Sequence, residues 1–181
     1  VEIRDTLGLT MDVEGEFAAL RARLDRSFPV DALVSRGEAF TSRLLAEYLG
    51  YTYVDAADCV FFSPDGRIDR QKTDEAIRRA AEAYGRIVIP GFYGSLPSGK
   101  LKVMSRGGSD ITGALAAAAL GAEVYENWTD VSGILMADPK IVKDPSPIRR
   151  ITYNELRELA FLGASVLHEE AVLPVKERGI P

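Results

Sequence analysis

The feature that most constrains the fold is a short β-branched run, RIVIPGF (residues 86–92), that directly follows a helical pattern. A run of this length and composition is typical of a strand that is buried on both faces. The preceding segment places Ile77, Ala80, Ala81 and Tyr84 on one helical seam, and Gly85 ends it. A helix that leads into a doubly buried strand predicts an α/β layered fold with a largely parallel sheet.

The alternation of helical and extended patterns continues along the chain, without an internal repeat. Strands are expected at 51–56, in KLKVMS (100–105) after a hairpin turn, and in EVYENWTDV. Trp128 is expected to pack in the core, with a ligand cleft as the alternative. DALVSRGE is expected to begin extended and to turn at Arg36 and Gly37. The proline-spaced DPKIVKDPSPIRR predicts a long surface loop. Helices are expected at 13–28, with a seam of Phe17, Leu20 and Leu24, from the Gly37 turn to Gly50, and in SDITGALAAAALG. Near the C-terminus, one helix is expected from a Thr152–Glu155 capping box to Gly163. Another is expected in SVLHEEAVLPVKERG, with a bend at Pro174.

Composition excludes several classes of protein. The 181 residues, 46% hydrophobic and 27% charged, suffice for one domain or a large part of one. A formal net charge of -5 argues against a sequence-independent nucleic-acid binder. With one cysteine, Cys59, and one histidine, His168, neither an intrachain disulfide nor a Cys/His zinc cage can form. Cys59 is read as a small buried apolar residue, and no run is long enough for a membrane span. A cytoplasmic protein is expected.

The first of two glycine-rich turns, GSLPSGK at 94–100, matches the G-x-x-x-x-G-K part of a phosphate-binding loop. However, Leu101 stands where that loop requires a metal-holding Ser or Thr. In addition, the following residues alternate as a strand rather than forming a helix. A plain hairpin loop is therefore expected here.

The second turn, RGGSD at 106–110, follows a strand and opens a helix, so that backbone N–H groups and the positive helix end converge on one point. Gly107 and Gly108 allow a close backbone approach, Arg106 adds a positive charge, and Ser109 or Asp110 can cap the helix. This arrangement suits an anion. The alternative is a tight strand-to-helix turn with an ordinary cap.

Two further polar turns follow expected strands, where open α/β sheets bind their ligands. One holds Ser35 and Glu38 in SRGE, and the other holds Thr129 and Asp130. Glu38 could instead be a capping carboxylate, and Asp130 an Asx cap. Together with RGGSD they place three polar turns after three strands, which favours a shared ligand site.

Five stretches resemble the aspartate kinases of the amino acid kinase family in order and spacing. They are SRGE, IPGFYGS, SRGGSDITG, TDVSGILMADPKIV and ITYNELRELAFLGASVLHEEAV, and the match runs from about residue 30 to the end. The resemblance implies an α/β/α sandwich with a mainly parallel sheet. It also implies transfer of the γ-phosphoryl group of ATP, with Mg²⁺, to the side-chain carboxylate of L-aspartate. The product would be 4-phospho-L-aspartate, which enters lysine, threonine and methionine biosynthesis.

The resemblance also implies residue roles. Glu38 would hold the substrate's amino group with Ser35 beside it, and Arg106 would grip a substrate carboxylate. Ser109 would line the transfer site, and Asp110 would orient a lysine that neutralises the phosphates. The implied nucleotide contacts are Gly107, Gly108, Thr129, Asp130 and Lys140. No residue is assigned as a metal ligand.

Several departures from the family pattern qualify these roles. Lys140 stands where arginine is common, Ser165 where many relatives have lysine, and Leu135 where an aromatic residue often stacks on the base. The family's opening Lys-x-Gly-Gly-(Ser/Thr) stretch and its regulatory ACT domains have no counterpart in this sequence. Residues 1–181 are therefore expected to be a partial kinase domain with weak or no activity alone.

Two rival interpretations stay open. One is a sister enzyme that acts on glutamate, acetylglutamate or a nucleoside monophosphate. The other is a non-catalytic binding or assembly module, and a homo-oligomer is compatible with either.

Overall fold

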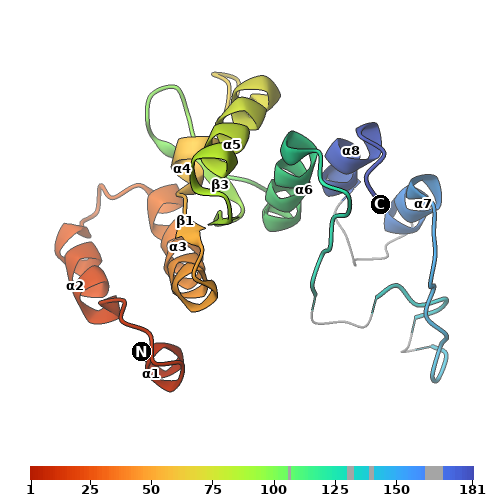
Figure 1. The fold of residues 1–181 in the computed structure, drawn as a ribbon, viewed down its shortest axis with the longest axis horizontal. Helices are drawn as coiled ribbons and strands as arrows, with labels where there is room; N and C mark the ends of the chain where they lie inside the picture. The colour runs from red at the N-terminus through yellow and green to blue at the C-terminus, as the bar shows by residue number, and fades with distance from the viewer. Residues whose placement is uncertain (106, 130–132, 139–140, 162–168) are drawn as a thin grey trace.

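The structure is a computed structural model that describes residues 1–105, 107–129, 133–138, 141–161 and 169–181 (Figure 1). Helices and short strands are interspersed along the chain, and one pair of strands is parallel, which confirms the α/β class. The elements are α1 (Glu2–Thr6), α2 (Val13–Arg23), α3 (Val30–Leu49), β1 (Thr52–Tyr53), α4 (Ala56–Cys59), α5 (Arg70–Tyr84), β2 (Ile87–Val88), β3 (Tyr93–Ser95), β4 (Leu101–Val103), α6 (Gly108–Leu120), α7 (Tyr153–Phe161) and α8 (Glu169–Glu177).

The strands form one parallel and one antiparallel pair. β1 and β2 run parallel, with Thr52 opposite Ile87, and helix α3 packs against both strands. β3 and β4 are antiparallel, with Tyr93 opposite Val103. Their connection is the predicted hairpin, because the Leu96 N–H donates to the Lys100 carbonyl at 2.9 Å. The first glycine-rich turn therefore closes a hairpin, as expected.

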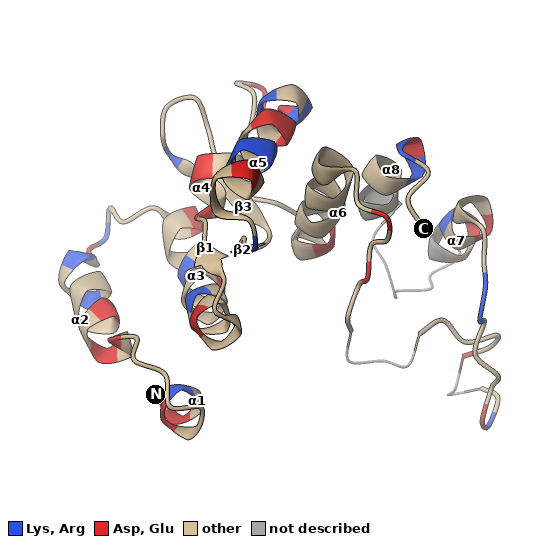
Figure 2. Cartoon of the chain, viewed as in Figure 1, with Lys and Arg blue, Asp and Glu red and all other residues tan. Residues whose placement is uncertain are grey.

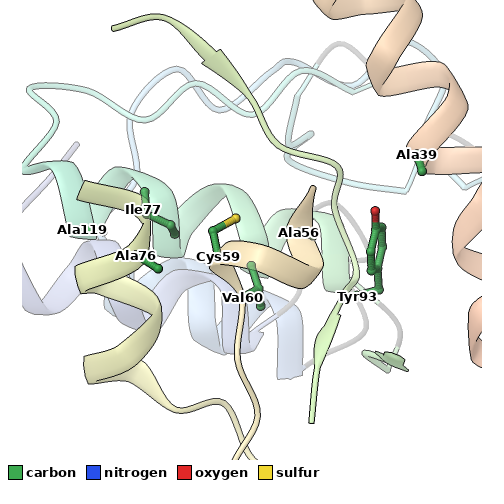
Figure 3. Close-up of a cluster of buried hydrophobic side chains, with 8 residues drawn as sticks. All are labelled: Ala39, Ala56, Cys59, Val60, Ala76, Ile77, Tyr93 and Ala119. Atoms are coloured by element: carbon green, nitrogen blue, oxygen red, sulfur yellow. The ribbon is translucent and has the colours of Figure 1, made fainter. Parts of the chain in front are cut away.

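The main core lies where four helices meet strand β3 (Figure 3). The side chains of Ile77, Tyr93 and Val60, the residue that follows α4, are fully buried. Cys59 is buried as predicted, and burial raises the pKa of its thiol to about 12. The cluster consists of Ala39, Ala56, Cys59, Val60, Ala76, Ile77, Tyr93 and Ala119. Small residues from α3, α4, α5 and α6 let the elements of this core pack closely.

The expected extended segment and turn at Ser35–Gly37 is wrong, because α3 is continuous from Val30 to Leu49. One interior glycine costs about 1 kcal/mol, which a helix of this length tolerates. Ser35 also satisfies its hydroxyl within the helix, where its Oγ donates to the Ala32 carbonyl at 3.1 Å. The predicted end at Gly50 is confirmed by its left-handed φ of 67°.

Two expectations about apolar residues are also wrong. The described part of EVYENWTDV, residues 123–129, forms no strand, and Trp128 is 89% exposed rather than packed in the core. The helix expected over 13–28 ends at Arg23, and Phe17 is more than half exposed, with its ring 4.9 Å from that of Phe40. Periodicity identifies the character of a segment but not the partner that must cover it.

Two predictions for the C-terminal part of the chain are confirmed: the loop in DPKIVKDPSPIRR, as far as it is described, and the start of the helix that follows it. Glu155 accepts from the Thr152 N–H at 2.8 Å, and the Glu155 N–H donates to the Thr152 hydroxyl at 3.3 Å, which confirms the capping box. The described residues of 138–150 contain no helix or strand, and a single bridge joins Leu135 to Pro147. Pro174 lies inside α8. Gly163, Ser165 and His168 lie outside the described residues. No helix in the described ranges is long and apolar enough to cross a bilayer.

The hydroxyl groups of buried Tyr93 and half-buried Tyr53 predict how stability depends on pH. Burial, and hydrogen bonding to Asp55, raise the pKa of Tyr93, and burial raises that of Tyr53. The unfolded chain loses these protons near the ordinary tyrosine pKa of about 10, so it binds fewer protons than the folded chain above that pH. Stability is therefore expected to fall as the pH rises through that range, and less steeply in Tyr93→Phe. Urea midpoints measured between about pH 9 and pH 11 test this; equal slopes would contradict it.

Candidate functional site

A pocket of about 310 Å³ lies between α3, β2 and α6, and we call it the Glu38–Ser109 pocket. Its volume is at the lower end of the range for small-molecule sites, roughly 300–1,000 Å³. Two of the three predicted polar stretches meet here, one through Glu38 and one through Ser109. The lining residues are Glu38, Ile87, Ile89, Gly91, Ser109, Thr112, Gly113, Ala116 and Leu120. The lining is thus mostly apolar, with three polar side chains, those of Glu38, Ser109 and Thr112.

Glu38 reaches the pocket from the middle of α3 and not from a turn. Three residues earlier, Ser35 is fully buried, and its Oγ accepts from the Arg36 guanidinium at 3.1 Å. Ser35 is not among the lining residues, whereas half-buried Glu38 is. The pocket therefore has one acidic wall, which suits a ligand with an ammonium group.

Ser109 stands in the first turn of α6, which begins after Gly107 at a left-handed φ of 80°. The expectation that Ser109 or Asp110 caps this helix is wrong: the cap residue is Gly107, and no side chain among the described residues caps it. A left-handed backbone favours glycine at this position. The N–H groups of the first turn and the helix dipole therefore point toward the space before the helix, which suits an anion.

Asp110, also in this first turn, is held by the segment that follows α6. The Tyr125 hydroxyl donates to the Asp110 carbonyl at 3.1 Å, and the Asn127 amide donates to the Asp110 carboxylate at 3.4 Å. Figure 2 shows α6 without any other charged residue. Asp110 is therefore the one carboxylate that α6 carries at its N-terminal end.

The turn after β2, in the IPGFYGS stretch, completes the pocket, and the sequence did not single out its hydrogen bond to Thr112. A Cβ atom at Gly91 would lie 2.7–2.8 Å from Ser109 atoms, including the Ser109 Cα, so glycine lets the two segments touch. Phe92 has a strained φ of 59°, and its N–H donates to the Thr112 hydroxyl at 3.2 Å. Thr112 lies one turn after Ser109 on the same face of α6, and this spacing is the signal that would have identified it.

The remaining predicted site residues are placed as follows. Gly108 is buried, and a Cβ there would lie 2.7 Å from the Cβ atoms of Met104 and Phe92, so glycine is required here by packing within the protein. Thr129 is exposed and does not line the Glu38–Ser109 pocket. Arg106, Asp130 and Lys140 lie outside the described residues. Within the described ranges, no group of three or more His, Cys, Asp or Glu residues could hold a metal ion.

Gly91→Ala is expected to lower the free energy of unfolding by about 1–3 kcal/mol, because its methyl group must displace Ser109. The matched control is Gly37→Ala in α3, where a Cβ would meet nothing within 4 Å. The control should raise stability by about 0.5–1 kcal/mol, the usual gain from alanine in a helix interior. Chemical denaturation measures both variants. Equal effects would contradict the close contact between Gly91 and Ser109.

Comparison with known proteins identifies the family. The family model described as "Amino acid kinase family" matches residues 4–181. Aspartokinase 3 of Bacillus subtilis is 38% identical over 168 residues, which cover 87% of this chain and 37% of that protein. An aspartokinase of Thermus thermophilus is 35% identical over 185 residues, 96% of this chain and 45% of the relative. The chain thus spans less than half the length of these curated relatives.

Solved structures agree in fold. The aspartate kinase of Clostridium acetobutylicum superposes with a TM-score of 0.88 at 44% identity, over 99% of this chain and 40% of that one. Escherichia coli aspartokinase III in complex with aspartate and ADP gives a TM-score of 0.75 at 31% identity, over 83% of this chain and 36% of that one. These neighbours confirm the fold expected from the sequence.

Proposed function

Because the chain belongs to the amino acid kinase family, we propose that it forms part of an aspartate kinase. Such an enzyme transfers the γ-phosphoryl group of ATP to the side-chain carboxylate of L-aspartate, giving 4-phospho-L-aspartate for lysine, threonine and methionine biosynthesis. The observation that carries the proposal is the Glu38–Ser109 pocket, which joins an acidic wall to an uncapped helix N-terminus. L-aspartate carries the complementary charges, one ammonium group and two carboxylates.

In this proposal each wall of the pocket binds one end of the substrate. The Glu38 carboxylate accepts hydrogen bonds from the ammonium group, and Arg106 pairs with a carboxylate, as a guanidinium does best. Ser109 and the first-turn N–H groups of α6 stabilise negative charge where the phosphoryl group moves. Ser35, three residues before Glu38 on α3, donates its hydroxyl to a carbonyl of the same helix. In this proposal it does not bind substrate directly.

The chemistry demands positioning more than acid–base catalysis. A carboxylate oxygen of L-aspartate attacks the γ-phosphorus as ADP leaves, and this nucleophile is already deprotonated at neutral pH. No general base is needed for the attack. Glycine turns, fixed cations and helix N–H groups therefore suffice, because they position the two reactants and neutralise the phosphate charge.

The nucleotide is assigned to two parts of the chain. One is the RGGSD turn, with Gly107 and Gly108, and the other is the stretch after α6 that contains Thr129, Asp130 and Lys140. A Mg²⁺ ion carried by the phosphates of ATP needs only one or two protein carboxylates, and Asp110 offers one in the first turn of α6. When bound, the ion would neutralise phosphate charge. We place the reaction in the cytoplasm, because a lone buried thiol such as Cys59 suits a reducing compartment.

Calorimetric titration of this chain with four acceptors tests the proposal. The acceptors are L-aspartate, L-glutamate, N-acetyl-L-glutamate and uridine monophosphate, each added with and without Mg-ATP. We expect L-aspartate to bind at least about tenfold more tightly than the others, since one added methylene group that shifts the ligand's charged ends costs about 1–3 kcal/mol. Tighter binding of another acceptor would indicate a sister kinase. Binding of none of the four would contradict the proposal.

A further inference from the structure

A second and larger pocket, of about 500 Å³, lies beside strand β4 of the hairpin, and we call it the Lys102 pocket. The loop 62–68, strand β4 and the first turn of α6 enclose it, and it shares no lining residue with the Glu38–Ser109 pocket. Its volume lies within the range of sites that hold small organic molecules. The roles proposed above for substrate and nucleotide do not use it.

Two cations meet at this pocket, and no acidic residue lines it. The Lys102 ammonium group lies 5.7 Å from the centre of the Phe62 ring, and it forms no ion pair with any residue that the structure describes. The Lys102 ammonium group also lies 3.2 Å from the position that a Cβ atom on Gly66 would take. It is therefore close to the backbone next to Arg67.

Arg67 is only partly neutralised. Its Nε lies 3.6 Å from the Asp65 carboxylate, which also accepts hydrogen bonds from the Ser63 hydroxyl and the Arg67 N–H. The Arg67 side chain is 88% exposed, and its guanidinium keeps further donors for another partner. One lysine without an ion pair among the described residues, and one arginine beside a single carboxylate, leave the pocket with net positive charge.

The rest of the lining is apolar. Phe62 and Ile111 are each only 4% exposed, and half-buried Ile68 and Met104 extend the same surface. A mostly apolar wall with a few convergent polar groups is the usual composition of a small-molecule site. An inorganic anion would pair with Lys102 and Arg67 but would leave the apolar wall in contact with water, so a ligand with an apolar part fits the pocket better.

We propose that the Lys102 pocket binds a small organic anion, with a phosphate or carboxylate group at Lys102 and Arg67 and an apolar body against Phe62 and Met104. The charge of the cations selects the anionic group, and the apolar wall selects the body. The site is separate from the Glu38–Ser109 pocket, so its occupant does not compete with L-aspartate or ATP.

Phenyl phosphate is the probe, titrated into the full chain and followed by ¹H–¹⁵N NMR at Gly66, Ser105 and Ile111. We expect saturable shifts at these amides, and weaker binding of inorganic phosphate and of benzyl alcohol than of phenyl phosphate. Lys102→Met should weaken binding about tenfold, the effect of one lost charge-assisted hydrogen bond. The matched control is Lys100→Met, an exposed lysine of the hairpin turn, which should change the affinity less than about twofold.

Arg67→Gln is the second variant, since its exposed side chain can be replaced without disturbing the core. It should also weaken binding. Three results would overturn the proposal: no saturable shift, an equal loss in Lys102→Met and Lys100→Met, or displacement of phenyl phosphate by L-aspartate or ATP. The last result would assign the pocket to the substrate site.

Discussion

Replacing Asp55 with alanine is expected to lower the free energy of unfolding by about 3 kcal/mol, the largest loss of stability that we predict for a single side chain outside the apolar core. The Asp55 carboxylate accepts from the Tyr93 hydroxyl at 2.8 Å and from the Tyr53 hydroxyl at 3.1 Å. It also caps helix α4 by accepting from the Ala57 N–H at 3.0 Å. One substitution therefore removes three hydrogen bonds.

The cost is large because the partners are left without an acceptor. Tyr93 is fully buried in the main core, and a buried hydroxyl without a partner costs about 1–3 kcal/mol. Loss of the helix cap adds about 1 kcal/mol. In a chain of this size the sum corresponds to a fall in melting temperature of about 6–12 °C.

Asp58→Ala is the matched control, because Asp58 lies in the same short helix but is exposed. Its removal should change the free energy of unfolding by no more than about 0.5 kcal/mol. Thermal and urea denaturation measure both variants. Similar losses in the two would show that α4 tolerates neither substitution and that the bonds to Tyr53 and Tyr93 contribute little.

Glu38→Gln is expected to weaken the binding of L-aspartate by about 10- to 100-fold, the largest functional effect that we predict. The substitution keeps the shape of the side chain and removes its charge, so the substrate ammonium group loses a charge-assisted hydrogen bond of about 1.5–3 kcal/mol. Because Glu38 is half-buried on α3 and no described ion pair holds it, the fold should be unaffected. Calorimetry of L-aspartate binding measures the loss.

The control for this variant is Glu82→Gln, which removes the same charge from the exposed face of α5. It should leave the affinity unchanged within about twofold. Ligands without an ammonium group, such as succinate, should bind the wild type and Glu38→Gln alike. If succinate lost as much affinity as L-aspartate, Glu38 would act on the pocket as a whole and not on the ammonium group.

The elements that the sequence predicts correctly are those with strong local signals. Pro97 and Gly99 specify the hairpin turn, alanines in SDITGALAAAALG specify a closely packed helix, and Thr152 with Glu155 specifies a capping box. Each depends on contacts within a few residues, which the sequence shows directly. The failures are elements that depend on distant partners. Residues 123–129 have a strand-like composition, but a strand forms only beside another strand.

The site shows the same division. Because ligands bind at the carboxyl ends of strands, the sequence led us to expect Glu38 close to Ser109, and the structure brings both to one pocket. The reason given for Glu38 was wrong, because it reaches the pocket from the middle of a helix. Thr112 was not predicted. Its one-turn spacing from Ser109 places it on the same face of α6, but its contact with Phe92 spans 20 residues and requires a strained backbone, which no local pattern shows.

The central claim is that the Glu38–Ser109 pocket is the binding site for L-aspartate, and an NMR titration tests it most directly. Adding L-aspartate to the ¹⁵N-labelled chain should shift the amides of Gly91, Thr112 and Gly113, which line this pocket. The amides of Gly66 and Ile111, which line the Lys102 pocket, should stay in place. Shifts confined to Gly66 and Ile111, or no saturable shift at any amide, would contradict the account.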